Sequence, residues 1–168
     1  MPRTDFYLKI AGALLLSLSA ASMMTTATGY RGVVAGIAAV SALLLVKSAE
    51  RSSRRHGRTD RMKVSLVTST VLYEIVLLVG AASAASKFAG VLAIAAVSFS
   101  ELLHTEAMQE LKQSFSPDIG REGRIIVLAL SLAVSGFNSW VLFYGLLFIA
   151  VLAVYDSLRL IHRLSREL

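Results

Sequence analysis

The sequence predicts an all-α integral membrane protein with six transmembrane helices and with both termini in the cytoplasm. Three observations predict this fold class: the composition, a series of apolar runs, and the placement of basic residues. The 168 residues are 55% hydrophobic and 17% charged, with a mean hydropathy of +0.67, which is more apolar than a soluble domain of this size. Residues 1–168 are therefore expected to form one six-helix transmembrane domain.

Six apolar runs mark the expected helices. Several of them are shorter than the roughly 20 residues that cross a bilayer, and we expect polar helical extensions to supply the missing length. For the first run, the alternative is a signal peptide in which Arg3 and Lys9 precede an apolar stretch and "SAAS" is the cleavage site. The runs cover residues 6–24, 32–46, 64–82, 88–103 with a polar extension to 113, 124–135 and 140–160.

The basic residues give the orientation. With six spans, all of the 17 Lys and Arg residues except Arg31 and Lys87 fall on the side of the two termini. Because positive residues favour the cytoplasmic side, this distribution predicts a multi-pass cell-membrane protein with cytoplasmic termini. The formal charge of +6 is expected to face anionic lipid headgroups, not nucleic acid. The absence of cysteine excludes thiol chemistry.

The most basic connection is "SAERSSRRHGRTDRMKVSL", residues 48–66. Its arginines recur at spacings of three and four, which would put most of them on one face if the second helix continued through them. Arginine suits bidentate phosphate contacts, so this stretch is either a lipid-phosphate site or a solvated anchor on anionic headgroups. Together with the start of the fifth helix, the candidate anion-binding residues are Arg54, Arg55, Arg58, Arg61, Arg121 and Arg124.

Glu74 is the carboxylate that the sequence puts well inside an apolar run. Ionisable residues there are costly and often functional, so Glu74 is a candidate intramembrane polar site, and a hydrogen-bonded packing residue is the alternative. Glu101 and His104 are spaced as in a Glu-x-x-His motif. A di-metal bundle needs two such motifs and further carboxylates, so no metal site is expected.

The segment "GVVAG", residues 32–36, has the small-xxx-small spacing that lets membrane helices approach closely. Any helix rich in alanine and glycine produces this spacing by chance. The spacing is therefore read here as a feature of composition, and no partner helix is assigned to it.

Two patches resemble the CDP-alcohol phosphotransferases, membrane enzymes that make phospholipid headgroups. "SRRHGRTDRMKVSL" is similar to the segment that follows the family signature. "SELLHTEAMQEL…GREGRIIVLAL" is similar to the passage between the fourth and fifth helices of the family. The resemblance implies six spans with cytoplasmic termini, a magnesium or manganese cofactor in active members, and a tendency to dimerise.

The signature of that family is D-x-x-D-G-x-x-A-R, then eight residues, then G-x-x-x-D-x-x-x-D. When Ser53 and Arg54 are set on its A-R pair, only Arg54 survives, and Glu50 and Lys63 occupy the glycine positions. Aliphatic side chains cannot hold a divalent cation, so the resemblance implies no catalytic residue, no metal site and no cofactor. The four aspartate positions are occupied by Val46, Ala49, Val67 and Val71.

The resemblance therefore implies a non-catalytic partner or regulatory subunit of phospholipid biosynthesis that binds lipid phosphate. Such a chain could form a homodimer or pair with an active paralogue. One alternative is an active headgroup transferase that releases CMP and uses a relocated site with Glu50, Asp60 and Glu74. Another is a small transporter or channel subunit with Glu74 as its intramembrane charge, and a last one is an accidental likeness.

Overall fold

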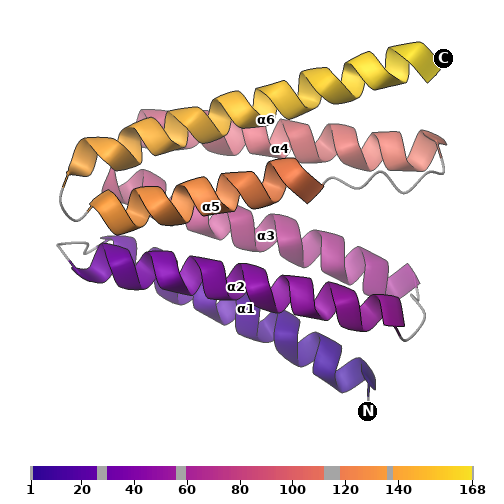
Figure 1. The fold of residues 1–168 in the computed structure, drawn as a ribbon, viewed down its shortest axis with the longest axis horizontal. Helices are drawn as coiled ribbons and strands as arrows, with labels where there is room; N and C mark the ends of the chain where they lie inside the picture. The colour runs from indigo at the N-terminus through magenta and orange to yellow at the C-terminus, as the bar shows by residue number, and fades with distance from the viewer. Residues whose placement is uncertain (1, 26–29, 56–59, 112–117, 136–137, 168) are drawn as a thin grey trace.

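The computed structural model of the chain describes residues 2–25, 30–55, 60–111, 118–135 and 138–167 (Figure 1). Within these residues the chain forms six α-helices and no strand, as the apolar runs predict. The helices are α1 (Pro2–Thr25), α2 (Tyr30–Arg55), α3 (Asp60–Ala84), α4 (Lys87–Leu111), α5 (Asp118–Ser135) and α6 (Ser139–Glu167).

Each helix extends beyond its apolar run, as expected from the length that a membrane span requires. α2 continues through basic residues to Arg55, and α5 begins at Asp118, six residues before its apolar part.

Local chemistry fixes some of the helix ends. Pro2 begins α1, where a missing N–H costs nothing, and the Asn138 side-chain Oδ1 accepts a hydrogen bond from the Trp140 N–H at 3.0 Å before the first turn of α6.

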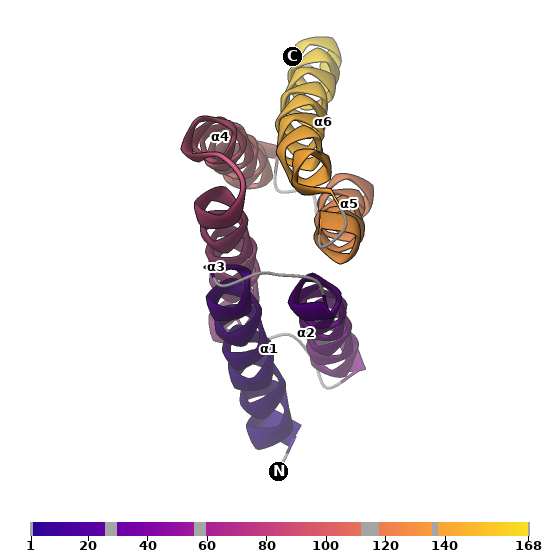
Figure 2. The ribbon, with the colours of Figure 1, turned by 90° about the vertical axis from the view of Figure 1, so that its left-hand side faces the viewer.

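The helices form two rows of three, which Figure 2 shows end on. One row contains α1, α3 and α4, and the other contains α2, α5 and α6. Close packing of α1 on α2 and of α4 on α6 joins the rows at their two ends. In the middle, neither α3 nor α4 packs closely on α5, so this part of the interior depends on long side chains.

Small residues let the helices approach one another within and between the rows. A Cβ added at Gly36 would lie 2.7 Å from the carbonyl oxygen of Ala129, where α2 meets α5. A Cβ at Gly80 would lie 2.6 Å from the Cα of Ala21, where α3 meets α1. Gly36 belongs to the "GVVAG" segment, so the small residue at that position has a definite partner helix, which the composition argument did not assign.

Over the described residues, five helices are long and apolar enough to cross a membrane, so the chain is a multi-pass helical membrane protein. α5 differs because charged residues fill its first two turns. Both termini lie at the same end of the bundle (Figure 1). α1 packs on α2 and α3 with Phe6 and Ala20 fully buried, so the run considered as a signal peptide forms part of the core.

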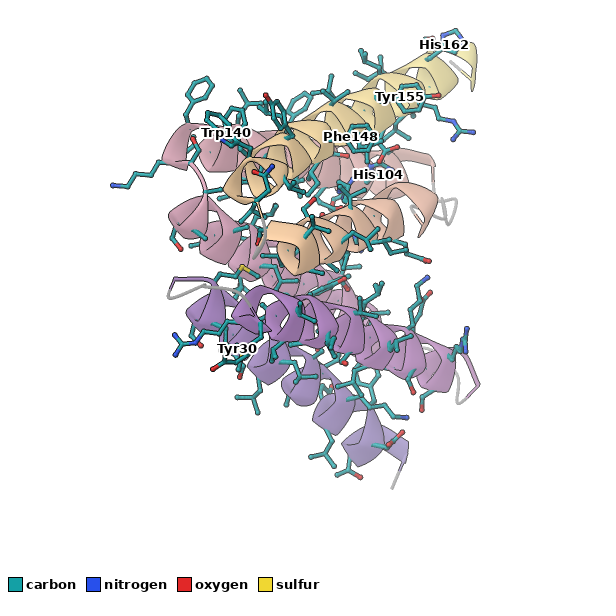
Figure 3. All side chains as sticks on the ribbon, turned by 60° about the vertical axis from the view of Figure 1, so that its left-hand side comes forward. Tyr30, His104, Trp140, Phe148, Tyr155 and His162 are labelled. Carbon is teal, nitrogen blue, oxygen red and sulfur yellow. The ribbon has the colours of Figure 1, made fainter. Side chains whose placement is uncertain are left out.

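The outward faces of the helices are apolar and aromatic. Along α6, Trp140, Phe148 and Tyr155 are all more than half exposed, and Figure 3 shows them distributed over the length of the helix. Such a surface suits contact with lipid, because the interior of the bundle is where the polar side chains gather.

Candidate functional site

Five charged side chains from four helices meet inside the bundle, and we refer to them as the ion cluster. α3 contributes one carboxylate, α4 and α6 contribute one each, and α5 contributes two arginines. The cluster occupies the part of the interior where α5 has no close packing with α3 or α4. Its members are Glu74, Glu101, Arg121, Arg124 and Asp156.

Arg124 is the centre of the ion cluster. Its Nε donates to Glu74 Oε1 at 2.8 Å, and its Nη2 donates to Glu101 Oε1 at 3.0 Å and to Glu74 Oε2 at 3.4 Å. Its Nη1 donates to Asp156 Oδ2 at 3.1 Å. One guanidinium group therefore binds carboxylates from three helices, which the fixed fork of five N–H donors permits and a lysine would not.

Arg121 lies one turn earlier on α5 and completes the cluster. Its Nε donates to Glu101 Oε1 at 3.1 Å, its Nη2 binds the other oxygen of Glu101, and its Nε lies 3.8 Å from Glu74 Oε2. Lys47 of α2 forms a separate ion pair with Glu122 on the neighbouring face of α5.

The position of α5 explains why these charges are buried. In Figure 1, the first turn of α5 lies well inside the bundle, whereas α4 and α6 continue towards the end where the termini lie. The first turns of α5 therefore place Arg121 and Arg124 among the other helices. Gly120 is needed there, because a Cβ at this position would collide with the Asp156 carboxylate.

Burial differs among the members of the cluster. Glu74 and Arg124 are each 2% exposed, and Glu101 is 8% exposed. The Asp156 side chain is 20% exposed and the Arg121 side chain 15%. The cluster therefore has a closed side at Glu74 and a partly exposed side at Asp156 and Arg121.

Buried hydroxyls without a hydrogen-bond partner lie on α2, α3 and α4, of which α3 and α4 contribute to the ion cluster. Among the described residues, these are the side chains of Tyr73, Ser100 and Ser53. Tyr73 precedes Glu74 on α3, is 0% exposed, and interacts electrostatically with Arg121, Arg124 and Glu122 as well as with Glu74. Within the described part of the chain its hydroxyl has no hydrogen-bond partner, and it lies on the turn of α3 that also carries Glu74.

The sequence pointed to only part of the ion cluster. Glu74 lies near the middle of its candidate span, residues 64–84, and is buried. Asp156 was missed, although it also lies within an apolar run, residues 140–162. Glu101 was considered only as a metal ligand, and the structure pairs it with two arginines. The available signal was the level of each residue along its helix. Glu101 and Asp156 lie in the carboxyl-terminal halves of α4 and α6, and Arg124 lies in the amino-terminal half of α5, which runs the opposite way.

Arg121 and Arg124 were expected to face an anion together with the arginines of residues 48–66. In the structure both bind carboxylates, and anion binding by them stays a prediction. The prediction that these arginines share one face of the second helix is wrong for Arg61, because α2 ends at Arg55 and Arg61 belongs to α3. Arg54 and Arg55 form the last residues of α2, and Arg58 lies outside the described residues.

The four positions aligned with the family aspartates lie on α2 and α3. Val46 and Ala49 are buried, Val67 is 36% exposed and Val71 is half-buried. None of them lines the groove of about 610 Å³ that lies between α1 and α3. That groove is lined by Ile10, Leu14, Val64, Ser65, Thr68, Ser69 and Leu72.

The donors present do not suit a divalent metal. The aligned positions offer no oxygen, and the carboxylates of the ion cluster are occupied by guanidinium groups. Over the described residues, no group of three or more His, Cys, Asp and Glu side chains is arranged to hold a metal ion. His104 has its Nδ1 2.9 Å from the carbonyl oxygen of Ser100, within its own helix.

Comparison with models of known protein families finds no match to this chain, and comparison with curated protein sequences finds none either. The fold and the ion cluster therefore define the class of protein, a multi-pass helical membrane protein with a buried ionic centre.

Proposed function

We propose that this chain is a non-catalytic membrane protein of the CDP-alcohol phosphotransferase type. In this proposal it binds the phosphate groups of anionic lipids and acts as a partner or regulatory subunit in phospholipid synthesis. The observation that carries the proposal is the engagement of the buried carboxylates by arginine. Glu74, which the relocated transferase site with Glu50 and Asp60 would have to use, binds Arg124 instead, and Glu101 binds the same arginine.

The chemistry of headgroup transfer supports this reading. A transferase that acts on a pyrophosphate needs carboxylates free to hold divalent cations and a base for the incoming alcohol. A carboxyl group in a buried pair with arginine has oxygen lone pairs occupied by the hydrogen bonds it accepts, so these are not open to a divalent cation. Removing it from the pair leaves an uncompensated charge, which costs several kcal/mol.

The proposed orientation has the end of the bundle with the termini in the cytoplasm. The basic residues support this orientation, since Arg31 and Lys87 are the only Lys or Arg assigned to the other end. In a cell membrane, anionic lipid headgroups would then meet the basic end, where each Lys or Arg near the surface contributes about 1 kcal/mol.

In this proposal, the contacts with lipid phosphate are made by the connection between α2 and α3 and the helix ends beside it. Arg121 and Arg124 use their guanidinium groups on carboxylates, which leaves Arg54, Arg55, Arg58 and Arg61 as the arginines for lipid phosphate. A partner chain, either a second copy or an active paralogue, would join through the membrane-facing helix surfaces.

The first experiment is an activity measurement. Purified protein is incubated with CDP-diacylglycerol, candidate alcohols, and magnesium or manganese, and the release of CMP is followed. The proposal expects no release above that of a heat-treated sample. Release that is lost in Glu74→Gln or Glu50→Gln would instead support the relocated transferase site.

The second experiment measures lipid binding in nanodiscs by native mass spectrometry. Wild-type protein is expected to retain phosphatidic acid or phosphatidylglycerol over phosphatidylcholine, and the double variant Arg54→Gln, Arg55→Gln should lose this preference. Arg159→Gln is the matched control, because Arg159 is an exposed arginine near the same end of the bundle. Equal retention by the double variant and the control would contradict the proposed lipid-phosphate site.

The transporter alternative rests on the buried charge at Glu74. It predicts ion flux in liposomes that disappears in Glu74→Gln. The absence of flux, together with selective retention of anionic lipid, favours the lipid-binding subunit.

A further inference from the structure

The ion cluster has an unequal number of acidic and basic groups. It contains the carboxylates of Glu74, Glu101 and Asp156 but only the guanidinium groups of Arg121 and Arg124. Arginine stays protonated in proteins. If all carboxylates were ionised, the cluster would carry one excess negative charge within the bundle, which is costly at membrane depth.

We propose that the ion cluster is a proton-binding site, which holds one exchangeable proton in the folded protein, carried by the carboxyl group of Glu74. The bound proton removes the excess charge and leaves two ionised carboxylates against two guanidinium groups. This proposal does not depend on the proposed lipid-binding function, because it concerns the interior of the bundle and not its basic end.

The surroundings of the three carboxylates favour Glu74 as the one that carries the proton. Glu101 receives hydrogen bonds from both arginines. Asp156 lies against Gly120 in the first turn of α5, where the positive end of the helix dipole favours an anion. Glu74 is the most deeply buried carboxylate, and its hydrogen bonds come from Arg124, whose charge is shared with the other two.

The unpaired hydroxyl of Tyr73 is an independent observation at the same place. It is completely buried, has no hydrogen-bond partner, and lies in the electrostatic field of Glu74, Arg121 and Arg124. A buried hydroxyl without a partner marks a position where a water molecule or an ion belongs.

Among the side chains that the structure describes, two lysines on the surrounding helices are engaged in ion pairs outside the cluster. On α2, Lys47 is already paired with Glu122 of α5. On α1, Lys9 pairs with Asp5 near the start of the helix. The titratable and charged groups on the helices that surround Glu74 include Asp5 and Lys9 on α1, Lys47 and Glu50 on α2, Tyr73 on α3, Glu101 and His104 on α4, Arg121, Glu122 and Arg124 on α5, and Asp156 and Arg159 on α6.

Asp156 gives the proton a way in and out. Its side chain is 20% exposed and binds Arg124, which in turn binds Glu74. Arg124 has no acceptor atom and stays protonated, so it does not relay the proton; the proton would reach Glu74 by way of water admitted on the side of Asp156 and Arg121. This arrangement makes the proton exchangeable instead of permanently trapped.

The test uses infrared spectroscopy of the full chain in nanodiscs at neutral pH. A protonated carboxylic acid has a C=O band that ionised carboxylates lack, and we expect this band in the wild-type protein. The band should shift when glutamate is labelled with ¹³C at its side-chain carboxyl, and it should disappear reversibly as the pH is raised. No such band, or a band that does not respond to labelled glutamate and so belongs to Asp156, would overturn the assignment to Glu74.

Two variants test the charge balance itself. Glu74→Gln equalises the numbers of carboxylates and arginines, so the band should be absent, whereas the exposed-site control Asp5→Asn should retain it. A band that persists in Glu74→Gln contradicts the proposal. A wild-type protein without the band, but with a melting temperature that rises in sodium and not in potassium, would show that a bound sodium ion compensates the charge instead, which also overturns it.

Discussion

At the scale of single residues, Arg124 joins more of the molecule than any apolar side chain of the core can. Its N–H groups reach carboxylates on α3, α4 and α6, and its own helix packs closely on α2 and α6. The middle of the bundle, where α5 does not pack closely on α3 or α4, is therefore held by directional hydrogen bonds between charged groups.

Replacing Arg124 by glutamine should destabilise the protein by about 3–5 kcal/mol, because it leaves buried carboxylates without a partner. Arg124→Lys should recover only part of this loss, since one ammonium group cannot bind in three directions. Reversible unfolding in detergent and denaturant measures the change. Lys9→Gln removes an exposed helical pair and should cost less than about 1 kcal/mol; equal effects at the two positions would contradict the importance of the ion cluster.

Gly120 and Gly123 form a matched pair in the first turns of α5. A Cβ at Gly120 would displace the Asp156 carboxylate, whereas a Cβ at Gly123 meets nothing within 4 Å. Gly120→Ala should therefore cost about 1–3 kcal/mol through the lost contact of Asp156 with Arg124. Gly123→Ala should be neutral or stabilise by about 1 kcal/mol, since alanine is the better helix former. The same unfolding measurement decides, and a stabilised Gly120→Ala would show that Asp156 is dispensable.

At the scale of helices, close approach depends on small residues where two helices cross. Gly80→Ala should destabilise the protein by about 1–3 kcal/mol, because the new methyl group would meet the backbone of Ala21 on α1 and the helices would have to separate. Gly123→Ala again serves as the control. A Gly80→Ala protein as stable as this control would mean that α1 and α3 can separate without loss.

The helices themselves could be predicted from the sequence, because polar residues separate the apolar runs and polar extensions were expected where a run is too short to cross a bilayer. Their ends could be predicted approximately: the polar extension of the fourth helix was expected to reach residue 113, and α4 is described to Leu111. Glu74 could be found because a charge in an apolar run is conspicuous. Its partners could not, because Arg124 reaches it only through the arrangement of the two rows, which local sequence does not encode.

At the scale of the whole molecule, the proposed orientation can be tested because the chain contains no cysteine. Single cysteines at Ala84 and Ser165 lie at opposite ends of the bundle, and both positions are exposed. If the termini face the cytoplasm, a membrane-impermeant maleimide added to intact cells should label Ala84→Cys and leave Ser165→Cys unlabelled. Labelling after the membrane is opened provides the control, and the reverse pattern would contradict the orientation.

The inward position of the first turns of α5 also constrains biogenesis. Charged residues at the centre of a span oppose insertion by the translocon, at about 2.5–3.5 kcal/mol each for Arg and Asp. α5 carries Arg121, Glu122 and Arg124 in a helix of 18 residues, so the nascent chain should insert it together with α6 as a hairpin. Glu74 and Glu101 would enter the membrane earlier than α5. A ribosome stalled before residue 118 would therefore leave both carboxyl groups in the lipid without their arginine partners. Membrane proteases would be expected to remove such a product.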